Sequence, residues 1–356
     1  MKDKILVIGG YGNVGKIICR LLAEYYPGKV IAAGRSYRKA QKFAEETQGK
    51  VVPLRLDLQE TKNVTAHLGS QRLVISSIEL DNNGALAEAC LSEGTHYTEV
   101  GTSYETMQRV LALRSVASTA HSAIVSGTGL IPGLSNMLAK YLADQLTEVD
   151  HVNIHLMLGL GDTHGEDAIR WILSYANRTF KVRNGGKMVE VQTFRDPERV
   201  IFPDETKPRT TYRFDFADQH VVPKTTGAQG ASSRICFDSR LITYLLAQLS
   251  GTRLIKLVQI LPPKLLVSLL HLTRIGSNTF ALKVIAQGKN SEKKSTLSAS
   301  VRGSQEAYAT GLVTAFVGHA LYEGKVATGI HHVEEVLDFE EFFPWLEEHG
   351  LEINTN

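Results

Sequence analysis

The stretch "ILVIGGYGNVG", residues 5–15, consists of four apolar residues followed by four glycines within seven positions. A short apolar run that ends in glycine is typical of a buried strand, and apolar residues at helical spacing after residue 15 predict a helix. Gly10, Gly12 and Gly15 have the spacing G-x-G-x-x-G. Between a strand and a helix, this spacing is the dinucleotide-binding fingerprint. The alternative is a tight turn with a structural role only.

Each of these glycines has a physical reason in the dinucleotide interpretation. Gly10 would permit the tight turn, and a side chain at Gly12 would keep backbone N–H groups away from a pyrophosphate. Gly15 would let the helix pack against the strand. The amino terminus of that helix adds unpaired donors and the positive end of its dipole. The loop is therefore expected to bind the pyrophosphate of a cofactor.

The end of the second predicted strand indicates which cofactor. It reads "AAGRS", residues 32–36, and carries Arg35 and Ser36 without a carboxylate. An enzyme that uses NAD normally places an acidic residue there for the ribose 2′-hydroxyl. A guanidinium group instead suits a 2′-phosphate, to which it donates charge-assisted hydrogen bonds. We therefore expect NADP(H) to be favoured over NAD(H), the alternative being a solvated arginine.

Two further segments are candidates for cofactor contacts. Asp57 follows the third predicted strand and could accept a hydrogen bond from the adenine amine, or it could only cap the next helix. Ser76, Ser77 and Ile78 follow the fourth predicted strand. Dinucleotides bind at the carboxyl edge of doubly wound sheets, where these three residues are expected to lie.

The order of predicted elements indicates two domains in the 356 residues. Strands and helices alternate over residues 1–130, which predicts a parallel sheet with helices on both faces. Later segments predict antiparallel structure, including a hairpin that turns at residues 184–186. The expected fold is α/β, a Rossmann-type doubly wound parallel sheet with an inserted α+β domain. The Rossmann domain would comprise residues 1–130 plus 305–356, and the substrate and dimerisation domain residues 131–304.

Composition excludes several classes of function. The net charge of +2 does not favour nucleic acid or an acidic membrane surface as a partner. The three cysteines lie far apart without a CxxC pair, so we expect no disulfide framework or metal site and a reducing, cytoplasmic setting. Residues 253–272 are apolar but interrupted by charges and a Pro-Pro pair. They predict buried or amphipathic helices rather than a membrane span, with contact to a membrane surface as the alternative.

Four motifs in order, "GGYGNVG", "AGRS", "GTHYTEV" and "GTGLIPGLSNMLA", resemble the saccharopine dehydrogenase-like oxidoreductases of the saccharopine reductase type, whose relatives include carboxynorspermidine dehydrogenase. The resemblance implies a Rossmann domain with an inserted substrate domain. It also implies a nicotinamide cofactor and chemistry on secondary amines that join amino acids or polyamines to oxo compounds. The residues that match the family's cofactor site are Gly10, Tyr11, Gly12, Asn13 and Val14 in the phosphate loop, Arg35 and Ser36 in the NADP-reading turn, and Ser76, Ser77 and Ile78 on the nicotinamide side.

The substrate side departs from the family pattern. The segment with which saccharopine reductases grip substrate carboxylates is not recognisable, and "LGLGDTHGEDAIRWIL", residues 158–173, stands in its place. His164 in this loop and Tyr97 on the fifth predicted strand are candidate proton donors, and Arg170 could pair with a substrate carboxylate. The alternatives are a solvated loop histidine, a packed strand tyrosine and a surface ion pair.

The sequence thus predicts an NADP(H)-dependent oxidoreductase that acts on a carbon–nitrogen bond of a small, amino-acid-like substrate. A ketone or enoyl reductase is the alternative enzyme, and a non-catalytic NADP-binding regulator or scaffold is the alternative outside catalysis. A homodimer is expected. Residues 212–220, "YRFDFADQH", alternate aromatic and polar side chains as a half-buried strand does, and they are a candidate dimerisation surface.

Overall fold

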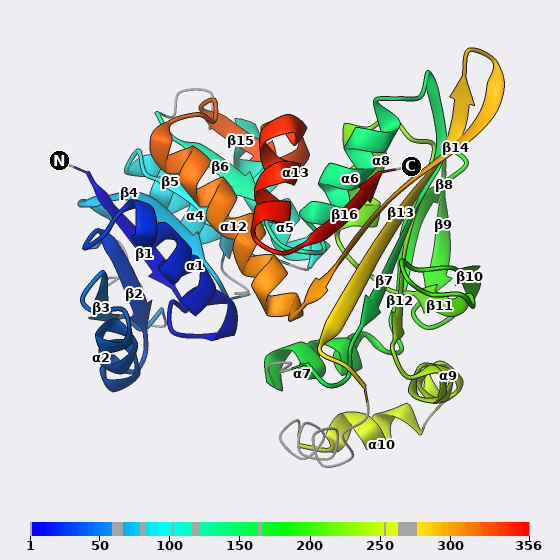
Figure 1. The fold of residues 1–356 in the computed structure, drawn as a ribbon, viewed down its shortest axis with the longest axis horizontal. Coiled ribbons are helices and arrows are strands. Elements are labelled where there is room, and N and C mark those ends of the chain that lie inside the picture. Colours follow the sequence, from blue (N-terminus) through cyan, green and yellow to red (C-terminus); the bar gives the residue numbers. More distant parts are fainter. Residues whose placement is uncertain are drawn as a thin grey trace. The chain divides into compact units, whose positions relative to one another are not determined.

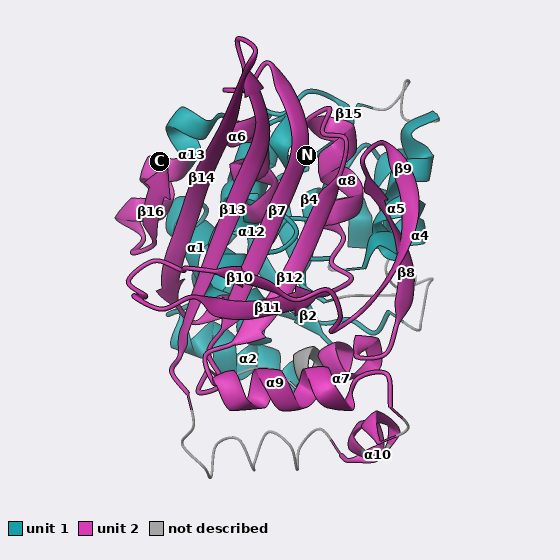
Figure 2. Cartoon of the chain, turned by 90° about the vertical axis from the view of Figure 1, so that its right-hand side faces the viewer, with its two compact units in different colours: residues 1–134, 307–342 teal, residues 135–306, 343–356 magenta. Residues whose placement is uncertain are grey.

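The computed structural model describes residues 2–58, 67–78, 83–101, 103–115, 121–162, 166–252, 254–262 and 276–355, without the side chains of residues 166–169 and 257. The chain divides into two compact units (Figure 2). Unit 1 comprises residues 1–134 and 307–342, and unit 2 comprises residues 135–306 and 343–356. From the sequence, residues 343–356 are expected in the first domain. They lie in unit 2 because the last strand pairs with the sheet of that unit.

Unit 1 is built on a seven-stranded sheet in the order β15-β6-β5-β4-β1-β2-β3, and every pair of neighbours is parallel (Figure 1). The strands are β1 Lys4–Ile8, β2 Val30–Gly34, β3 Val51–Arg55, β4 Gln71–Ser76, β5 His96–Glu99, β6 Ala123–Ser126 and β15 Gly329–His332. The chain order proceeds outward from β1 in both directions, which places the topological switch point between β1 and β4. The predicted α/β fold of the Rossmann type is confirmed.

The described residues of unit 1 also form α-helices and short 3-10 helices, several of which bury apolar side chains. They are α1 Asn13–Tyr25, α2 Tyr37–Glu46, α4 Asn83–Ser92, α5 Tyr104–Leu111, η1 Ala112–Ser115, α12 Glu306–Glu323, η3 Val333–Glu335 and α13 Phe339–Glu348, the last of which continues into unit 2. The strand "KILVI" is buried from Ile5 to Ile8, as expected for a strand covered on both faces. The helix α12 ends before Gly324, whose φ of 73° is left-handed.

Unit 2 is built on a mixed seven-stranded sheet in the order β10-β11-β12-β7-β13-β14-β16, whose long strands lie side by side in Figure 2. The strands are β7 Glu148–Leu158, β10 Glu198–Val200, β11 Arg209–Arg213, β12 Ala231–Phe237, β13 Thr279–Asn290, β14 Lys293–Ser304 and β16 Glu352–Thr355. The pair β7 and β12 is parallel, and the other pairs are antiparallel. This arrangement agrees with the predicted α+β character of the second domain.

A separate hairpin and several helices complete unit 2. They are β8 Thr179–Asn184 and β9 Lys187–Gln192, with α6 Leu134–Ala143, α7 Glu166–Tyr175, α8 Asp218–Thr225, α9 Arg240–Leu249 and α10 Ile255–Ile260. The hairpin turns at Gly185 and Gly186, both left-handed, as predicted. The strand predicted over 212–220 is wrong beyond Arg213, because Phe214 and Phe216 turn into an aromatic cluster with Trp171 and α8 begins at Asp218.

The sequence is expected to contain no membrane-spanning segment. No helix in the described ranges is long and apolar enough to cross a bilayer. Of residues 253–272, residue 253 and residues 263–272 lie outside the described part of the chain.

Candidate functional site

The glycine loop joins β1 to α1 at the carboxyl edge of the parallel sheet. The Gly12 N–H donates to the Gly9 carbonyl at 2.8 Å, and the Gly12 carbonyl accepts from the Lys16 N–H at 3.0 Å as the first bond of the helix. The helix begins at Asn13, so the N–H groups of its first turn point out of its amino-terminal end. The loop thus presents a helix amino terminus at the edge of the sheet, which is the geometry that binds phosphate.

The four glycines of the loop have distinct surroundings. A Cβ at Gly10 would lie 2.7 Å from Cα of Ala32 on β2, and one at Gly15 would collide with the Gly9 carbonyl oxygen. Gly12 is exposed, and a Cβ there would meet only the Gly9 oxygen, at 3.1 Å. Gly15 thus serves packing, as expected, while Gly12 faces open space. The turn that the Gly12 N–H and the Gly9 carbonyl close passes through Gly10, and Gly9 before it has a left-handed φ of 76°.

Tyr11 connects the glycine loop to the turn that follows β2. Its ring occupies the space beside Gly34, where a Cβ would lie 2.6 Å from the phenol. Its hydroxyl oxygen accepts a hydrogen bond from the Ser36 N–H at 2.9 Å. The Ser36 hydroxyl accepts from the Lys39 N–H at 3.4 Å and so caps α2. The two predicted cofactor segments are therefore held in direct contact.

The turn after β2 carries a cluster of exposed cations. Arg35 is exposed, and so are Arg38 and Lys39 in the first turn of α2, which contains no acidic residue. Of these three cations, only Arg35 is predicted from the sequence as a cofactor contact. The basic residues three and four positions later are a further signal in the sequence, because positions 35, 38 and 39 all lie at the start of one helix. Three exposed cations therefore gather at this turn, with no acidic residue in the first turn of α2.

The segment after β4 contacts the glycine loop from the other side. The Ser77 N–H and hydroxyl both donate to the Ile8 carbonyl, at 3.0 and 2.8 Å. A Cβ at Gly9 would lie 2.7 Å from both the Ser77 hydroxyl and the Ile78 side chain. The structure thus brings together the three predicted segments that begin at residues 10, 35 and 76. Asp57 is half-buried after β3, next to the turn at Gly34, whose carbonyl accepts from the Leu56 N–H at 3.0 Å.

A buried carboxylate that the sequence analysis did not select lies at the same edge. Glu99 is the last residue of β5 and is 1% exposed. It accepts hydrogen bonds from the hydroxyls of Tyr97, at 2.9 Å, and Ser126, at 2.8 Å. The signal in the sequence was an acidic residue at the carboxyl end of a strand with an inward-facing pattern, within "HYTEV".

The three candidate catalytic residues differ in where the structure places them. Tyr97 is fully buried, and burial together with the Glu99 carboxylate raises the pKa of its phenol well above the usual value. This position supports the packed-tyrosine alternative. Arg170 is exposed on α7 in unit 2, and His164 lies outside the described residues. Asp162, from the same segment, is buried and accepts from the Glu306 N–H at 2.7 Å, so it caps α12.

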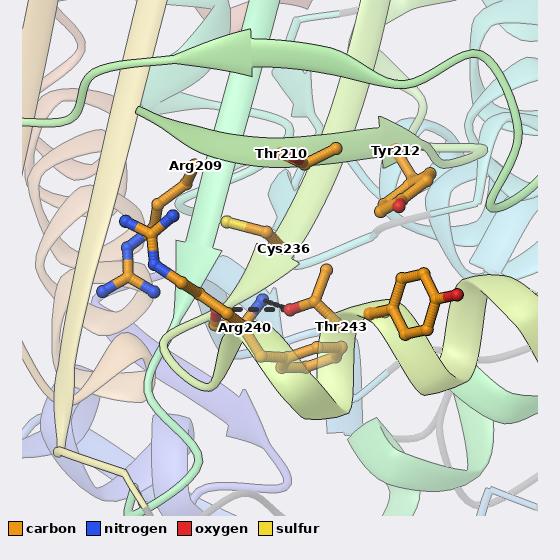
Figure 3. Close-up of a pocket in the computed structure, with 8 residues that line it drawn as sticks. Arg209, Thr210, Tyr212, Cys236, Arg240 and Thr243 are labelled. Atoms are coloured by element: carbon orange, nitrogen blue, oxygen red, sulfur yellow. Dashed lines mark hydrogen bonds between the residues drawn. The ribbon is translucent and has the colours of Figure 1, made fainter. Parts of the chain in front are cut away.

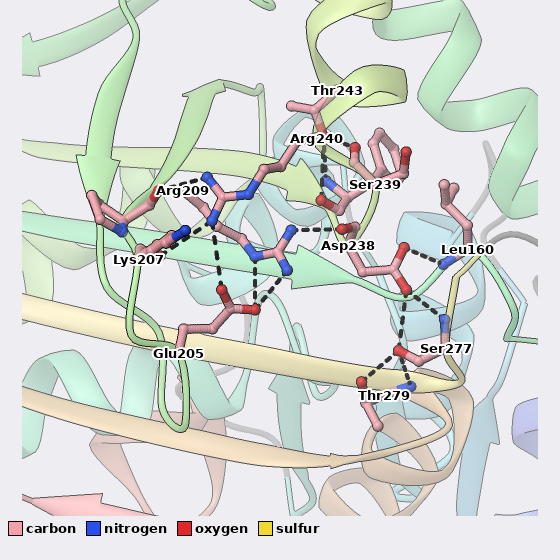
Figure 4. Close-up of polar contacts among 12 residues, drawn as sticks. Leu160, Glu205, Lys207, Arg209, Asp238, Ser239, Arg240, Thr243, Ser277 and Thr279 are labelled. Carbon is pink, nitrogen blue, oxygen red and sulfur yellow. Dashed lines mark hydrogen bonds and ion pairs between the residues drawn. The ribbon is translucent and has the colours of Figure 1, made fainter.

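Unit 2 contains a small cavity of about 100 Å³ between β11, β12 and α9 (Figure 3). None of the predicted site residues lines it. Arg209 donates to Glu205 at 2.6 and 2.9 Å and to the Asp238 carbonyl at 2.6 Å, and Arg240 donates to the Pro208 carbonyl at 2.8 Å (Figure 4). Burial raises the pKa of the Cys236 thiol to about 12, which leaves it protonated and unreactive at neutral pH. Because protein acceptors already engage both guanidinium groups, this region is best described as a structural frame.

Among the described side chains, no group of three or more His, Cys, Asp or Glu residues is arranged to hold a metal ion. The candidate site is the carboxyl edge of the unit 1 sheet, where the loops after β1, β2 and β4 meet.

Comparisons with known proteins agree with this geometry. Residues 5–127 match the family model of the saccharopine dehydrogenase NADP binding domain, which confirms the resemblance found in the sequence. Apo saccharopine dehydrogenase (L-Glu forming) from Saccharomyces cerevisiae has a similar fold, with a TM-score of 0.69, 13% identity, and coverage of 99% of this chain and 100% of that one. Homospermidine synthase from Legionella pneumophila, solved in complex with NAD, gives 0.70 at 12% identity, with coverage of 100% and 92%.

Proposed function

We propose that this chain, whose residues 5–127 match the saccharopine dehydrogenase NADP binding domain, is a saccharopine dehydrogenase-like, NADP(H)-dependent enzyme acting on a carbon–nitrogen bond of an amino-acid-like substrate. The observation that carries the proposal is the convergence of the loops after β1, β2 and β4 on one edge of a parallel sheet, at its switch point. Dinucleotides bind at this place in doubly wound sheets.

Each loop has a defined part in holding the cofactor. The N–H groups at the start of α1 would bind the pyrophosphate, and the exposed Gly12 leaves room for its approach. Arg35 and its basic neighbours would bind a 2′-phosphate. Ser76, Ser77 and Ile78 would border the nicotinamide. The cofactor, when bound, supplies the hydride, while the protein orients it and keeps competing water away.

The preference for NADP(H) is supported by the family's description and by the charge of the turn after β2. Homospermidine synthase from Legionella pneumophila, which has a similar fold, was solved with NAD, so the fold by itself does not select NADP(H). In this chain the turn has three cations and no acid in the first turn of α2. That charge complements a phosphate and provides no acceptor for a ribose 2′-hydroxyl.

Turnover tests the chemistry. Purified protein should reduce NADP⁺ when it is given secondary amines that join two amino-acid-like parts. It should oxidise NADPH when it is given the matching pairs of amine and oxo acid. Absorbance of NADPH follows both reactions. Gly12→Val, which places a branched side chain in the path of the pyrophosphate, should abolish both reactions.

The other outcomes of this screen identify the alternatives. Oxidation of NADPH by ketones or enoyl compounds alone would replace the carbon–nitrogen proposal with the reductase alternative. Tight NADPH binding without turnover of any of these compounds would favour the non-catalytic regulator.

The remaining expectations are part of the proposal. Unit 2 would bind the substrate and form a homodimer, and the reducing cytoplasm would be the setting, which is supported by three buried, free thiols. Size-exclusion chromatography with light scattering would test the dimer, and an elution as a monomer at all concentrations would contradict it.

A further inference from the structure

We propose that Glu99 is a positioning residue that fixes the nicotinamide side of the cofactor site, acting through the hydrogen-bonded ends of β4, β5 and β6. This inference rests on the proposed function and identifies the residue that organises one half of that site. Glu99 does not touch the cofactor in this account, because its side chain is almost fully buried.

The register of the sheet places Glu99 beside the nicotinamide-side segment. Its Cα is paired with that of Ser76, the last residue of β4, and the following Val100 N–H donates to the Ser76 carbonyl at 2.9 Å. The Ser76 hydroxyl in turn donates to the Ile78 carbonyl at 3.0 Å. The start of the 76–78 segment is thereby attached to β5 at the position that Glu99 occupies.

On its other side, Glu99 is bonded to β6 and to the residues that follow it. The Ser126 hydroxyl donates to one carboxylate oxygen, and the Tyr97 hydroxyl donates to the other. The Thr128 N–H and hydroxyl both donate to the Glu99 carbonyl, at 2.9 and 3.0 Å. Glu99 and the adjacent Val100 therefore connect the carboxyl end of β5 to those of β6 and β4.

The free-energy cost of burying a carboxylate explains why Glu99 at this position indicates a positioning role. Removing a charged group from water is costly unless hydrogen bonds compensate for the lost solvation, and an apolar side chain would carry no such cost. The hydroxyl donors of Tyr97 and Ser126 provide compensation and fix the direction of the carboxylate. A satisfied buried network of this kind holds its members in one arrangement. The element it holds is the edge against which the nicotinamide would lie.

The two ends of the site are held by different contacts, which makes the proposal testable. The Tyr11 contact with Ser36 holds the adenosine side, at the end of β2. The contacts of Ser77 with Ile8 and of Glu99 with its neighbours hold the nicotinamide side, at the ends of β4 and β5. Loosening Glu99 should therefore affect the nicotinamide half and leave the adenosine half unchanged.

The experiment compares the dissociation constants of NADPH and of 2′,5′-ADP, which contains the phosphorylated adenosine half and no nicotinamide. Glu99→Gln keeps the shape but replaces an acceptor oxygen with a donor, and Ser126→Ala removes one donor without changing the charge. Each variant should raise the dissociation constant of NADPH by about tenfold, which corresponds to about one hydrogen bond to a charged group. The dissociation constant of 2′,5′-ADP should change by less than about twofold. If Glu99→Gln does not fold, Ser126→Ala carries the test.

Thr95→Val is the matched control, because Thr95 is also fully buried, lies just before the opposite end of β5 and donates to the Gln71 carbonyl at 3.1 Å. It should lower stability without changing the ratio of the two affinities. An equal loss of both ligands in Glu99→Gln and Ser126→Ala, or no loss of NADPH, would overturn the positioning role. A wild-type protein that binds neither ligand would overturn the proposed function, and this inference with it. Wild-type binding that is lost selectively in the variants would support both.

Discussion

At the scale of single residues, Gly12 and Gly15 show how one motif combines binding and folding. Gly15 is buried, and any side chain there would meet the backbone of Gly9. Gly12 is exposed with φ −76° and ψ 178°, a conformation that any L-residue adopts. Both glycines belong to the same motif, but a methyl group added at Gly15 would collide with the backbone, whereas one added at Gly12 would point into open space.

We therefore expect Gly12→Ala to change the free energy of unfolding by less than about 1 kcal/mol, and to weaken NADPH binding at least tenfold by occupying the approach to the α1 amino terminus. Gly15→Ala should lower the free energy of unfolding by about 1–3 kcal/mol, the usual cost of overpacking. Urea denaturation and NADPH titration of both variants measure these effects. Wild-type affinity in Gly12→Ala would contradict the binding role.

At the scale of elements, α12 is held close to α1 by a glycine. A Cβ at Gly311 would lie 2.6 Å from Cγ2 and 2.8 Å from Cβ of Ile17, so the two helices meet with no room for a side chain. Since α1 carries the amino terminus of the candidate phosphate site, its position depends on a segment about 300 residues later in the chain.

Gly311→Ala tests this contact. In an exposed helix the change would raise stability by up to about 1 kcal/mol through helix propensity. Here the collision with Ile17 should dominate and lower stability by about 1–2 kcal/mol, with weaker NADPH binding as α1 shifts. A rise in the thermal midpoint would show that the two helices are less tightly packed than described.

Elements of the site differ in how far the sequence alone predicts them. The glycine loop and the strand and helix around it were predictable because their pattern is local, and so was the hairpin at Gly185 and Gly186. The network around Glu99 was not, because it depends on the register between three strands. The strand expected beyond Arg213 failed because aromatic packing and a helix start override a period of two. The pairing of β16 with β14 joins segments with no local signal.

At the scale of the whole molecule, two histidines, the buried His155 and the half-buried His151, make stability depend on pH. Burial, with the nearby Arg234 and Arg213, lowers the pKa of His155 from 6.5 to about 3 and that of His151 to about 4. The Nδ1 atom of His155 is 3.0 Å from the Thr211 hydroxyl, and its Nε2 atom is 3.9 Å from Glu198, too far for a hydrogen bond. Both imidazoles therefore stay neutral in the folded state at pH values where the unfolded chain binds protons.

The sign follows from proton counts. Between pH 6.5 and about 4 the unfolded state binds more protons, so the free energy of unfolding falls as the pH falls. Each histidine contributes a slope of at most about 1.4 kcal/mol per pH unit in this window. Denaturation of the wild type and of His155→Gln at several pH values separates the contribution of His155 to this slope from that of the carboxylates. The same slope in the variant and the wild type would contradict it.

The central claim is that the edge of the unit 1 sheet binds NADP(H) and that Arg35 reads the 2′-phosphate. The most direct measurement is fluorescence titration of the wild type and of Arg35→Ala with NADPH and NADH, with the exposed Arg199, on β10 of unit 2, changed to alanine as the control. We predict that the wild type binds NADPH more tightly. Arg35→Ala should lower the affinity for NADPH by about ten- to a hundredfold and leave the affinity for NADH almost unchanged. Arg199→Ala should bind both cofactors as the wild type does. Equal losses for both cofactors, or no binding of either by the wild type, would contradict the account.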